Sequence, residues 1–171
     1  MTAVKTFVNV TSVEHAIQDI AGWLSRVALI VAPPLLRLAL AVPFFKSGLT
    51  KWDGFLSLSP AAVFLFEDEF KLHVFGQDYG FPLPTAFAFF DGVAEIVLPV
   101  LLVIGLATRF SALGLLIMTG VIQLVVPEGW ANFHLPWAAL AVATIALGPG
   151  SLSLDHLTDM LRRRRIPQGG T

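Results

Sequence analysis

Charged side chains within long apolar stretches are the residues of this sequence most able to do chemistry. Arg37 lies in one such stretch, and Glu95 lies in another. A charge at the centre of a bilayer costs about 2.5–3.5 kcal/mol on insertion scales, so it needs a reason. Both residues lie about ten or eleven positions from the outer ends of their stretches, which indicates a matching depth. The spacing therefore predicts an Arg37–Glu95 ion pair that faces the interior of a helix bundle.

Further polar residues gather toward the same side of the apolar stretches. Asp91 lies one helical turn before Glu95 on the same face. We expect Glu95, Arg37 and Asp91 to be the catalytic candidates. The expected cofactor-binding residues come from the other stretches and are Lys46, Gln123, His134 and Trp137. Because the opposite half of the stretches is almost free of polar residues, the sequence predicts a polar pocket that opens outward.

Structural explanations of the same residues stay open. The Arg37–Glu95 pair could act only to fix helix register. Lys46 could extend its ammonium to the outer headgroups, and His134 could lie in the interface beside Trp137.

Several chemistries are set aside by composition and motif. The chain has no cysteine, which excludes disulfides and thiolate metal sites, so redox chemistry would need an external cofactor or a partner. The histidines do not form a pair of haem ligands within the apolar stretches, and no metal-ligand spacing is specific. We find no phosphate-binding glycine loop, nucleophile elbow or zinc-protease helix, so neither a metal nor a nucleotide is expected.

These residues need elements that can hold them in lipid. The chain has 171 residues, 56% hydrophobic and 13% charged, which is too apolar for a soluble domain of one compact unit. Only helices satisfy their backbone groups within one segment in lipid. We therefore predict an all-α, polytopic membrane four-helix bundle, a single membrane domain over residues 1–171. The expected spans cover about 27–48, 85–107, 110–126 and 135–147.

The segments outside these spans set the orientation. Lys and Arg concentrate in the N-terminal flank, at Arg109 and in Arg162–Arg165, so both termini are expected in the cytoplasm. Amphipathic patterns predict helices on the membrane surface at 13–25 and within the basic tail, 152–165. The four tail arginines are interpreted as a topology anchor that touches anionic lipid rather than nucleic acid. The long outer loop, 49–84, contains the apolar run Pro60–Phe66, which is either a packed loop or a lid over a site.

The sequence resembles the DoxX family of small bacterial membrane proteins over roughly Leu35 to His156. The matching segments are Leu36–Leu38, Phe44–Lys51, Ala94–Ile96, Leu102–Leu113, His134 with Trp137, and Gly148–His156. The positions that match the family pattern are Arg37, Lys51, Glu95 and Arg109. The resemblance implies a four-helix membrane bundle in the bacterial inner membrane. It also implies a link to redox chemistry, since some members of the DoxX and DoxD group are thiosulfate:quinone oxidoreductase subunits and others are linked to thiol redox homeostasis.

Two functions follow as hypotheses. The first is a quinone-linked oxidoreductase subunit, with a quinone carbonyl held by Arg37 or Lys46 and a proton carried outward by Glu95 or Asp91. Electrons would come from a redox partner or a soluble donor. The second is a module without catalysis, either an assembly partner of another membrane protein or a small transporter. Membrane lipid is expected around the protein in both cases, and a homo-oligomer is compatible with both.

Overall fold

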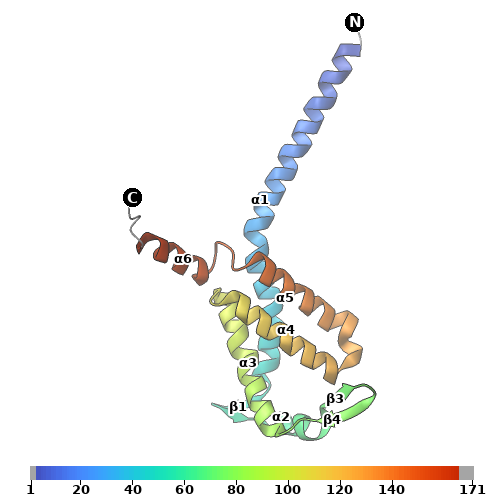
Figure 1. Ribbon diagram of the computed structural model, residues 1–171, viewed down its shortest axis with the longest axis vertical. Helices are drawn as coiled ribbons and strands as arrows, with labels where there is room; N and C mark the ends of the chain where they lie inside the picture. The colour runs from blue at the N-terminus through green and yellow to red at the C-terminus, as the bar shows by residue number, and fades with distance from the viewer. Residues whose placement is uncertain (1–2, 166–171) are drawn as a thin grey trace, which may run out of the picture. The chain divides into compact units, whose positions relative to one another are not determined.

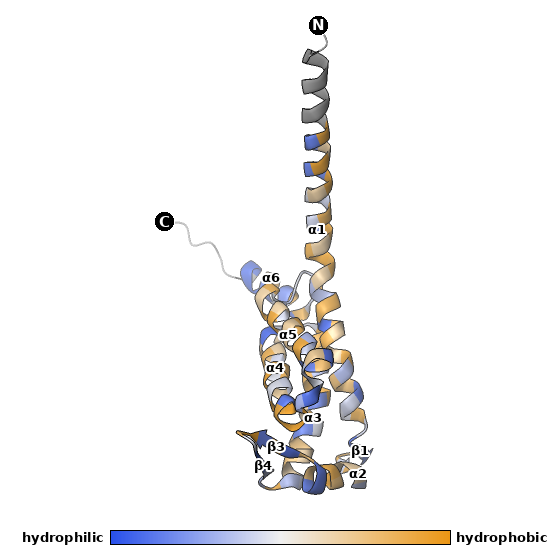
Figure 2. Cartoon of the chain, turned by 90° about the vertical axis from the view of Figure 1, so that its right-hand side faces the viewer, coloured by the Kyte–Doolittle hydropathy of each residue, from blue (hydrophilic) through white to orange (hydrophobic). Residues whose placement is uncertain are grey.

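The computed structural model describes residues 3–165, with side chains described for residues 13–164. The chain divides into two units, Met1–Ala32 and Pro33–Thr171. Within the described residues, four helical segments are long and apolar enough to cross a membrane: Val13–Leu49, Pro84–Ile104, Thr108–Val125 and Pro127–Leu147. The prediction of a mostly helical chain with four such segments is thus confirmed. Figure 2 shows how apolar residues predominate along these helices.

The first helix, α1, runs without interruption over Ala3–Leu49. We expected a surface helix at 13–25 followed by a span from 27, and the structure joins these two segments in one continuous helix. The helix continues through Ser25 and Arg26, whose side chains donate back to the carbonyls of Ala21, at 2.9 Å, and Gly22, at 3.2 Å. The surface location of residues 13–25 stays a prediction.

The next three helices form the centre of the second unit. α3 spans Pro84–Ile104, α4 spans Thr108–Val125, and α5 spans Leu135–Leu147. Figure 1 shows α4 running beside both α3 and α5, and these are the most extensively packed helix pairs. Proline is the first residue of α3, where its missing N–H breaks no helical bond. Gly105 ends the same helix with a φ of +71°, a left-handed conformation that glycine adopts without strain.

Short irregular turns lengthen the last span. The 3-10 turn η2, Pro127–Gly129, and the π-helical turn η3, Trp130–His134, lead directly into α5. We expected only residues 135–147 here, whereas the apolar helical segment covers 21 residues, Pro127–Leu147. The last helix, α6, covers Leu154–Arg165 and carries acidic and basic residues beside its leucines.

The segment between α1 and α3 has its own secondary structure. Strands β1, Trp52–Gly54, and β2, Ser57–Leu58, form one antiparallel hairpin. The helical turns α2, Pro60–Phe64, and η1, Leu65–Glu69, follow, and Ser59 caps α2 by accepting a hydrogen bond from the Ala62 N–H at 3.2 Å. Strands β3, Lys71–Val74, and β4, Gln77–Gly80, form the second antiparallel hairpin. We call this side of the second unit the loop end, and the opposite side, which carries α6, the tail end (Figure 1).

The core lies between α1 and the three central helices. Its buried residues are Leu40, Ala41 and Phe44 of α1, Leu102 of α3, Ala112 and Leu115 of α4, and Ala141 of α5. Small residues on α4 and α5 let these helices approach closely, as is usual in membrane bundles. This packing leaves the polar residues in two places, one toward each end of the second unit.

Candidate functional site

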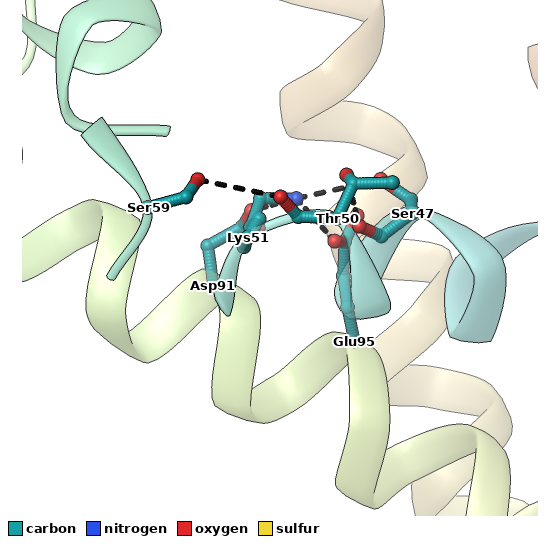
Figure 3. A network of polar contacts seen from close by, with 6 residues as sticks. All are labelled: Ser47, Thr50, Lys51, Ser59, Asp91 and Glu95. Atoms are coloured by element: carbon teal, nitrogen blue, oxygen red, sulfur yellow. Dashed lines mark hydrogen bonds and ion pairs between the residues drawn. The ribbon is translucent and has the colours of Figure 1, made fainter. Parts of the chain in front are cut away.

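A buried ion cluster lies toward the loop end (Figure 3). The ammonium of Lys51 bonds to Glu95 Oε2 and lies 3.0 Å from Asp91 Oδ2. It also donates to Ser47 Oγ at 3.4 Å. Only 12% of the Lys51 side chain and 4% of the Glu95 side chain are exposed, against 27% for Asp91. Two carboxylates therefore share one ammonium, and Asp91 is the carboxylate that reaches solvent.

The cluster follows from how α1 ends beside α3. The N–H groups of Thr50 and Lys51 bond to the carbonyls of Ser47 and Gly48, which forms a turn directly after the helix. Gly48 allows this turn to lie on α3, since a Cβ there would come within 3.0 Å of the Glu95 backbone. The turn is held from the other side by the Ser59 N–H, which donates to the Lys51 carbonyl at 2.9 Å. Lys51 thus reaches both carboxylates of α3 from a fixed turn.

A cavity of about 230 Å³ adjoins the cluster. Lys51, Asp91, Glu95 and Ser47 form its polar side. Its aromatic walls are Phe44, Phe66, Phe70, Phe81, Phe87 and Trp137. Phe66, Phe70 and Phe81 come from the segment between α1 and α3, so that segment lines the cavity. Whether it acts as a lid or is a packed loop stays a prediction. The site therefore combines flat apolar walls with a charged, hydrogen-bonding side.

The predicted Arg37–Glu95 pair is wrong. Arg37 donates to the carbonyl of Leu152 at 2.6 Å and to that of Val103 at 3.4 Å, and it lies against Gly105. Gly105 comes ten residues after Glu95, or about 15 Å further along α3. The prediction assumed that the outer ends of the two helices are level. In fact α1 ends beside Glu95, which is only half way along α3.

Arg37 belongs instead to a second polar group, at the tail end. Asp155 accepts hydrogen bonds from the N–H groups of Ala107, at 2.8 Å, and Thr108, at 2.9 Å, which begin α4. Burial alone would raise the pKa of the Asp155 carboxyl, but these hydrogen bonds and the charge of Arg37 lower it below its ordinary value. The Asp155 N–H in turn donates to the Gly105 carbonyl at 2.9 Å. This group fixes the turn between α3 and α4 to the first turn of α6 and, through Arg37, to Leu152 just before it.

The remaining predicted site residues divide into two sets. Trp137 lines the cavity and packs on Phe44, with ring centroids 5.2 Å apart. His134 and Gln123 bond to each other, Nδ1 to Oε1 at 2.6 Å, and the His134 ring packs against Trp137 rather than lining the cavity. Lys46 is exposed and lines a separate apolar groove between α1 and α3. The structure thus brings Glu95, Asp91 and Trp137 together and leaves Lys46 on another face.

Lys51 is the residue that the site analysis of the sequence missed, although it matches the family pattern. It was assigned to a polar turn outside the first span, where a lysine is expected to be solvated. The signal that could have identified it is the preceding Ser47-Gly48 pair, because a glycine there permits close contact with α3. Arg109, another position of the pattern, donates to the Ile145 carbonyl at 3.1 Å, in the last turn of α5. That contact complements the negative end of the helix dipole.

Four apolar helical segments, with a buried ion cluster between the end of the first and the middle of the second, define a multi-pass membrane protein. Such a protein is in contact with membrane lipid. Comparison with protein families matches residues 32–128, more than half of the chain, to DoxX. The chain belongs to the DoxX family.

A curated relative is a protein of Haemophilus influenzae described only as an uncharacterized protein. It is 31% identical over 141 residues, which cover 72% of this chain and 80% of the relative. No solved structure matches the chain. The family resemblance noted from the sequence is therefore confirmed, whereas the comparisons carry no activity over to this chain.

Proposed function

We propose that this DoxX-family protein is a quinone-linked membrane oxidoreductase subunit whose cavity binds the quinone ring. The observation that carries the proposal is the meeting of six aromatic side chains with the Lys51 ammonium in one cavity. Binding sites for small molecules are typically mostly apolar, with a few convergent polar groups that fix orientation. Buried charges in a membrane protein also indicate function by default.

The residues of the cavity fit a quinone ring. A flat conjugated ring packs favourably against aromatic side chains. A quinone carbonyl only accepts hydrogen bonds, and Lys51 is the charged donor on the polar side of the cavity, beside the hydroxyl of Ser47. Its bond to Ser47 Oγ, at 3.4 Å, is the longest of its contacts and is the one that a carbonyl oxygen would replace. Lys51 therefore takes the role that we first expected of Arg37 or Lys46.

The two carboxylates would have different roles. A bound quinone supplies the capacity to take up two electrons and two protons. Glu95 is nearly inaccessible and holds the Lys51 ammonium in place, whereas Asp91 is partly exposed and contacts the same ammonium. Asp91 is thus suited to exchange protons with water, and Glu95 is suited to position Lys51. Because the chain has no cysteine, electrons would come from a redox partner protein or a soluble donor.

The proposed setting is the bacterial inner membrane with both termini in the cytoplasm. Arg109 and the arginines of α6 lie toward the tail end, which supports a cytoplasmic location for that end. The leucines of α6 are exposed beside Arg162–Arg164, as expected for a helix that lies on an anionic lipid surface.

One observation favours the second hypothesis, a module without catalysis. All three N–H groups of the Lys51 ammonium have a partner, so the cluster could act only as a tie between α1 and α3. Such a tie would suit an assembly partner of another membrane protein. A small transporter fits less well, because Leu40, Leu102 and Leu115 are completely buried between the cluster and the tail end.

Quinone content distinguishes these functions. The full-length protein would be extracted with native lipid, and the quinone bound per protein would be measured by mass spectrometry. We expect a stoichiometric quinone that falls tenfold or more in Lys51→Met, since a hydrogen bond to a charged group contributes about 1.5–3 kcal/mol. Lys46→Met is the matched control and should keep its quinone, because that lysine lies on another face of α1.

The result that refutes the proposal is a wild-type protein with no more quinone than an unrelated helical membrane protein extracted in the same way. If the chain instead copurifies with another membrane protein, and does so equally well in Lys51→Met, the assembly role is favoured.

A further inference from the structure

An apolar groove runs between α1 and α3 on the face away from the aromatic cavity. Its tail-end part is a hollow of about 330 Å³, and its apolar lining includes Ala41, Val42 and Phe45 of α1 and Pro99, Val103 and Ile104 of α3. Its loop-end part is a hollow of about 560 Å³ between α3 and the β1–β2 hairpin. Val97 in the second hollow lies three residues before Val100 in the first, which places both on one face of α3. Lys46 and Leu49 are related in the same way on α1, so the two hollows form one groove, which we call the α1–α3 groove.

The groove faces the surroundings of a membrane span. α3 is one of the four segments long and apolar enough to cross a membrane. Val97, Val100 and Val103, on its groove side, are between 43% and 45% exposed. From Val93 to Ile104 the groove is about 16 Å long, close to half of the roughly 30 Å thickness of the hydrocarbon core of a bilayer. The acyl chain of a lipid in one leaflet therefore matches the groove in length.

Two opposite charges lie in the loop-end half of the groove. Lys46, in the last turn of α1, lines the first hollow, and Asp53, in β1, lines the second. Both residues are exposed, and neither has an ion-pair partner within the described part of the chain. Trp52 also lines the second hollow, and tryptophan is enriched at the headgroup layer. Because charge within hydrocarbon is costly, these side chains indicate that the groove meets the headgroup layer at this end.

The tip of the β1–β2 hairpin adds apolar surface to the same end. Phe55 is 96% exposed and Leu56 is 55% exposed, and both line the second hollow. Figure 1 shows β1 on the opposite side of the loop end from β3 and β4, so the second hairpin does not cover this tip. An acyl chain that enters the groove at the level of Asp53 would pack against both side chains.

Lipid rather than a second copy of the chain is the expected occupant. Apolar helix surface gains little by leaving lipid, so helices in membranes associate mainly through small residues and interhelical hydrogen bonds. The helix residues that line the groove are bulky instead, with Val42 and Phe45 on α1 and Val97 and Val100 on α3. The small residue among them, Ala41, is buried in the core.

We propose that the α1–α3 groove binds one phospholipid with a primary amine in its headgroup, such as phosphatidylethanolamine. One acyl chain lies along the apolar part of the groove, and the headgroup lies between Lys46 and Asp53. The Lys46 ammonium pairs with the lipid phosphate, and the Asp53 carboxylate accepts a hydrogen bond from the lipid ammonium. A lipid with net negative charge satisfies Lys46 and is repelled by Asp53, and a choline headgroup has no N–H to donate.

Lipid retention tests the proposal. The full-length protein would be placed in lipid discs with equal amounts of phosphatidylethanolamine, phosphatidylcholine and phosphatidylglycerol that carry the same acyl chains. Retained lipid would be identified by native mass spectrometry. We expect each chain to retain phosphatidylethanolamine in about threefold excess over either other lipid, which is within the range of one exposed ion pair.

Two variants and one control locate the lipid. Asp53→Asn should remove the preference for ethanolamine over choline. Lys46→Met should lower the retention of all three lipids about fivefold, as expected for one charge beside lipid phosphates. Asp78→Asn is the matched control, because Asp78 is also an exposed aspartate of a hairpin but lies on β4 and does not line the groove. This control should retain lipid as the wild type does.

Equal retention of the three lipids by the wild type, or a preference for phosphatidylglycerol, would overturn the proposal. A Lys46→Met variant that retains as much lipid as the wild type would also overturn it. A chain that retains no phospholipid and appears as a dimer would assign the groove to a second copy instead. Neither Lys46 nor Asp53 lines the aromatic cavity, so the quinone content of both variants should match that of the wild type. The lipid proposal therefore succeeds or fails independently of the proposed function.

Discussion

Replacing Lys51 with methionine is the sharpest test of the ion cluster. Methionine keeps the unbranched apolar stem and removes the ammonium that Glu95, Asp91 and Ser47 share. Removing one partner of a buried ion pair destabilises a protein by about 3–5 kcal/mol, because the other charge stays buried. The lower end applies here, since Asp91 is partly exposed and can turn to water. We therefore expect Lys51→Met to lower the free energy of unfolding by about 3 kcal/mol.

The measurement is reversible unfolding of the purified protein in mixed micelles of increasing SDS, followed by tryptophan fluorescence. Adding Glu95→Gln to Lys51→Met removes the stranded charge, so the double variant should be more stable than Lys51→Met alone. We expect a coupling free energy of about 2–3 kcal/mol between the two positions. Lys46→Met serves as the control, because Lys46 is exposed and should cost less than about 0.5 kcal/mol.

Two results would contradict this account of the cluster. One is a Lys51→Met variant that is no less stable than Lys46→Met. The other is a double variant whose loss equals the sum of the two single losses, since additivity would mean that Lys51 and Glu95 do not interact.

Three further predictions concern residues around the two polar groups. Arg37→Met and Glu95→Gln should lower the free energy of unfolding additively, to within about 0.5 kcal/mol in the same SDS assay, because the two side chains are not paired. A larger coupling free energy between the two substitutions would show that Arg37 and Glu95 interact. Asp155→Ala should cost about 1 kcal/mol through the lost cap of α4. Folding lowers the pKa of Asp155, so the ionised side chain stabilises the folded protein at pH values above the unfolded pKa of about 3.9. This stabilisation is lost as the pH falls through the folded pKa. The free energy of unfolding of Asp155→Ala should therefore change less on acidification than that of the wild type. Gly48→Ala should destabilise the chain, because its Cβ would lie 3.0 Å from the Glu95 backbone, whereas Gly120→Ala meets no atom and should be neutral or stabilising by thermal denaturation.

Much of the helical architecture could be predicted from sequence, because lipid imposes length and composition directly on each span. Gly105 and Gly148 end their helices, as apolar stretches bounded by glycine and proline suggested. The lengths of α1 and of the last span could not be predicted as well. In α1, the polar residues Ser25 and Arg26 suggest a stop, but their side chains bond within the helix. Before α5, the polar sequence also suggests a stop, but the turns η2 and η3 lengthen that span.

The candidate site was predictable only in part, because helix register depends on packing. Counting from the ends of two spans places two charges at one depth only if those ends are level. Gly48 brings the end of α1 against the middle of α3, which separates Arg37 from Glu95 and brings in Lys51 instead. The aromatic walls Phe66, Phe70 and Phe81 could not be assigned from sequence either, since the hairpins and turns that position them have no membrane periodicity.

The origin of those walls has a consequence for how relatives could diverge. The charged side of the cavity belongs to the turn after α1 and to α3, whereas half of its aromatic side chains belong to the segment between β2 and α3. Exchanging residues 60–82 between two members would therefore alter the shape of the cavity and leave Lys51, Asp91 and Glu95 unchanged, provided that the contacts of this segment with α3 and α4 are kept. A chimera that keeps those contacts should retain the ion cluster and change the walls of the cavity, so the charged and the aromatic sides of the cavity can diverge on separate stretches of the same chain.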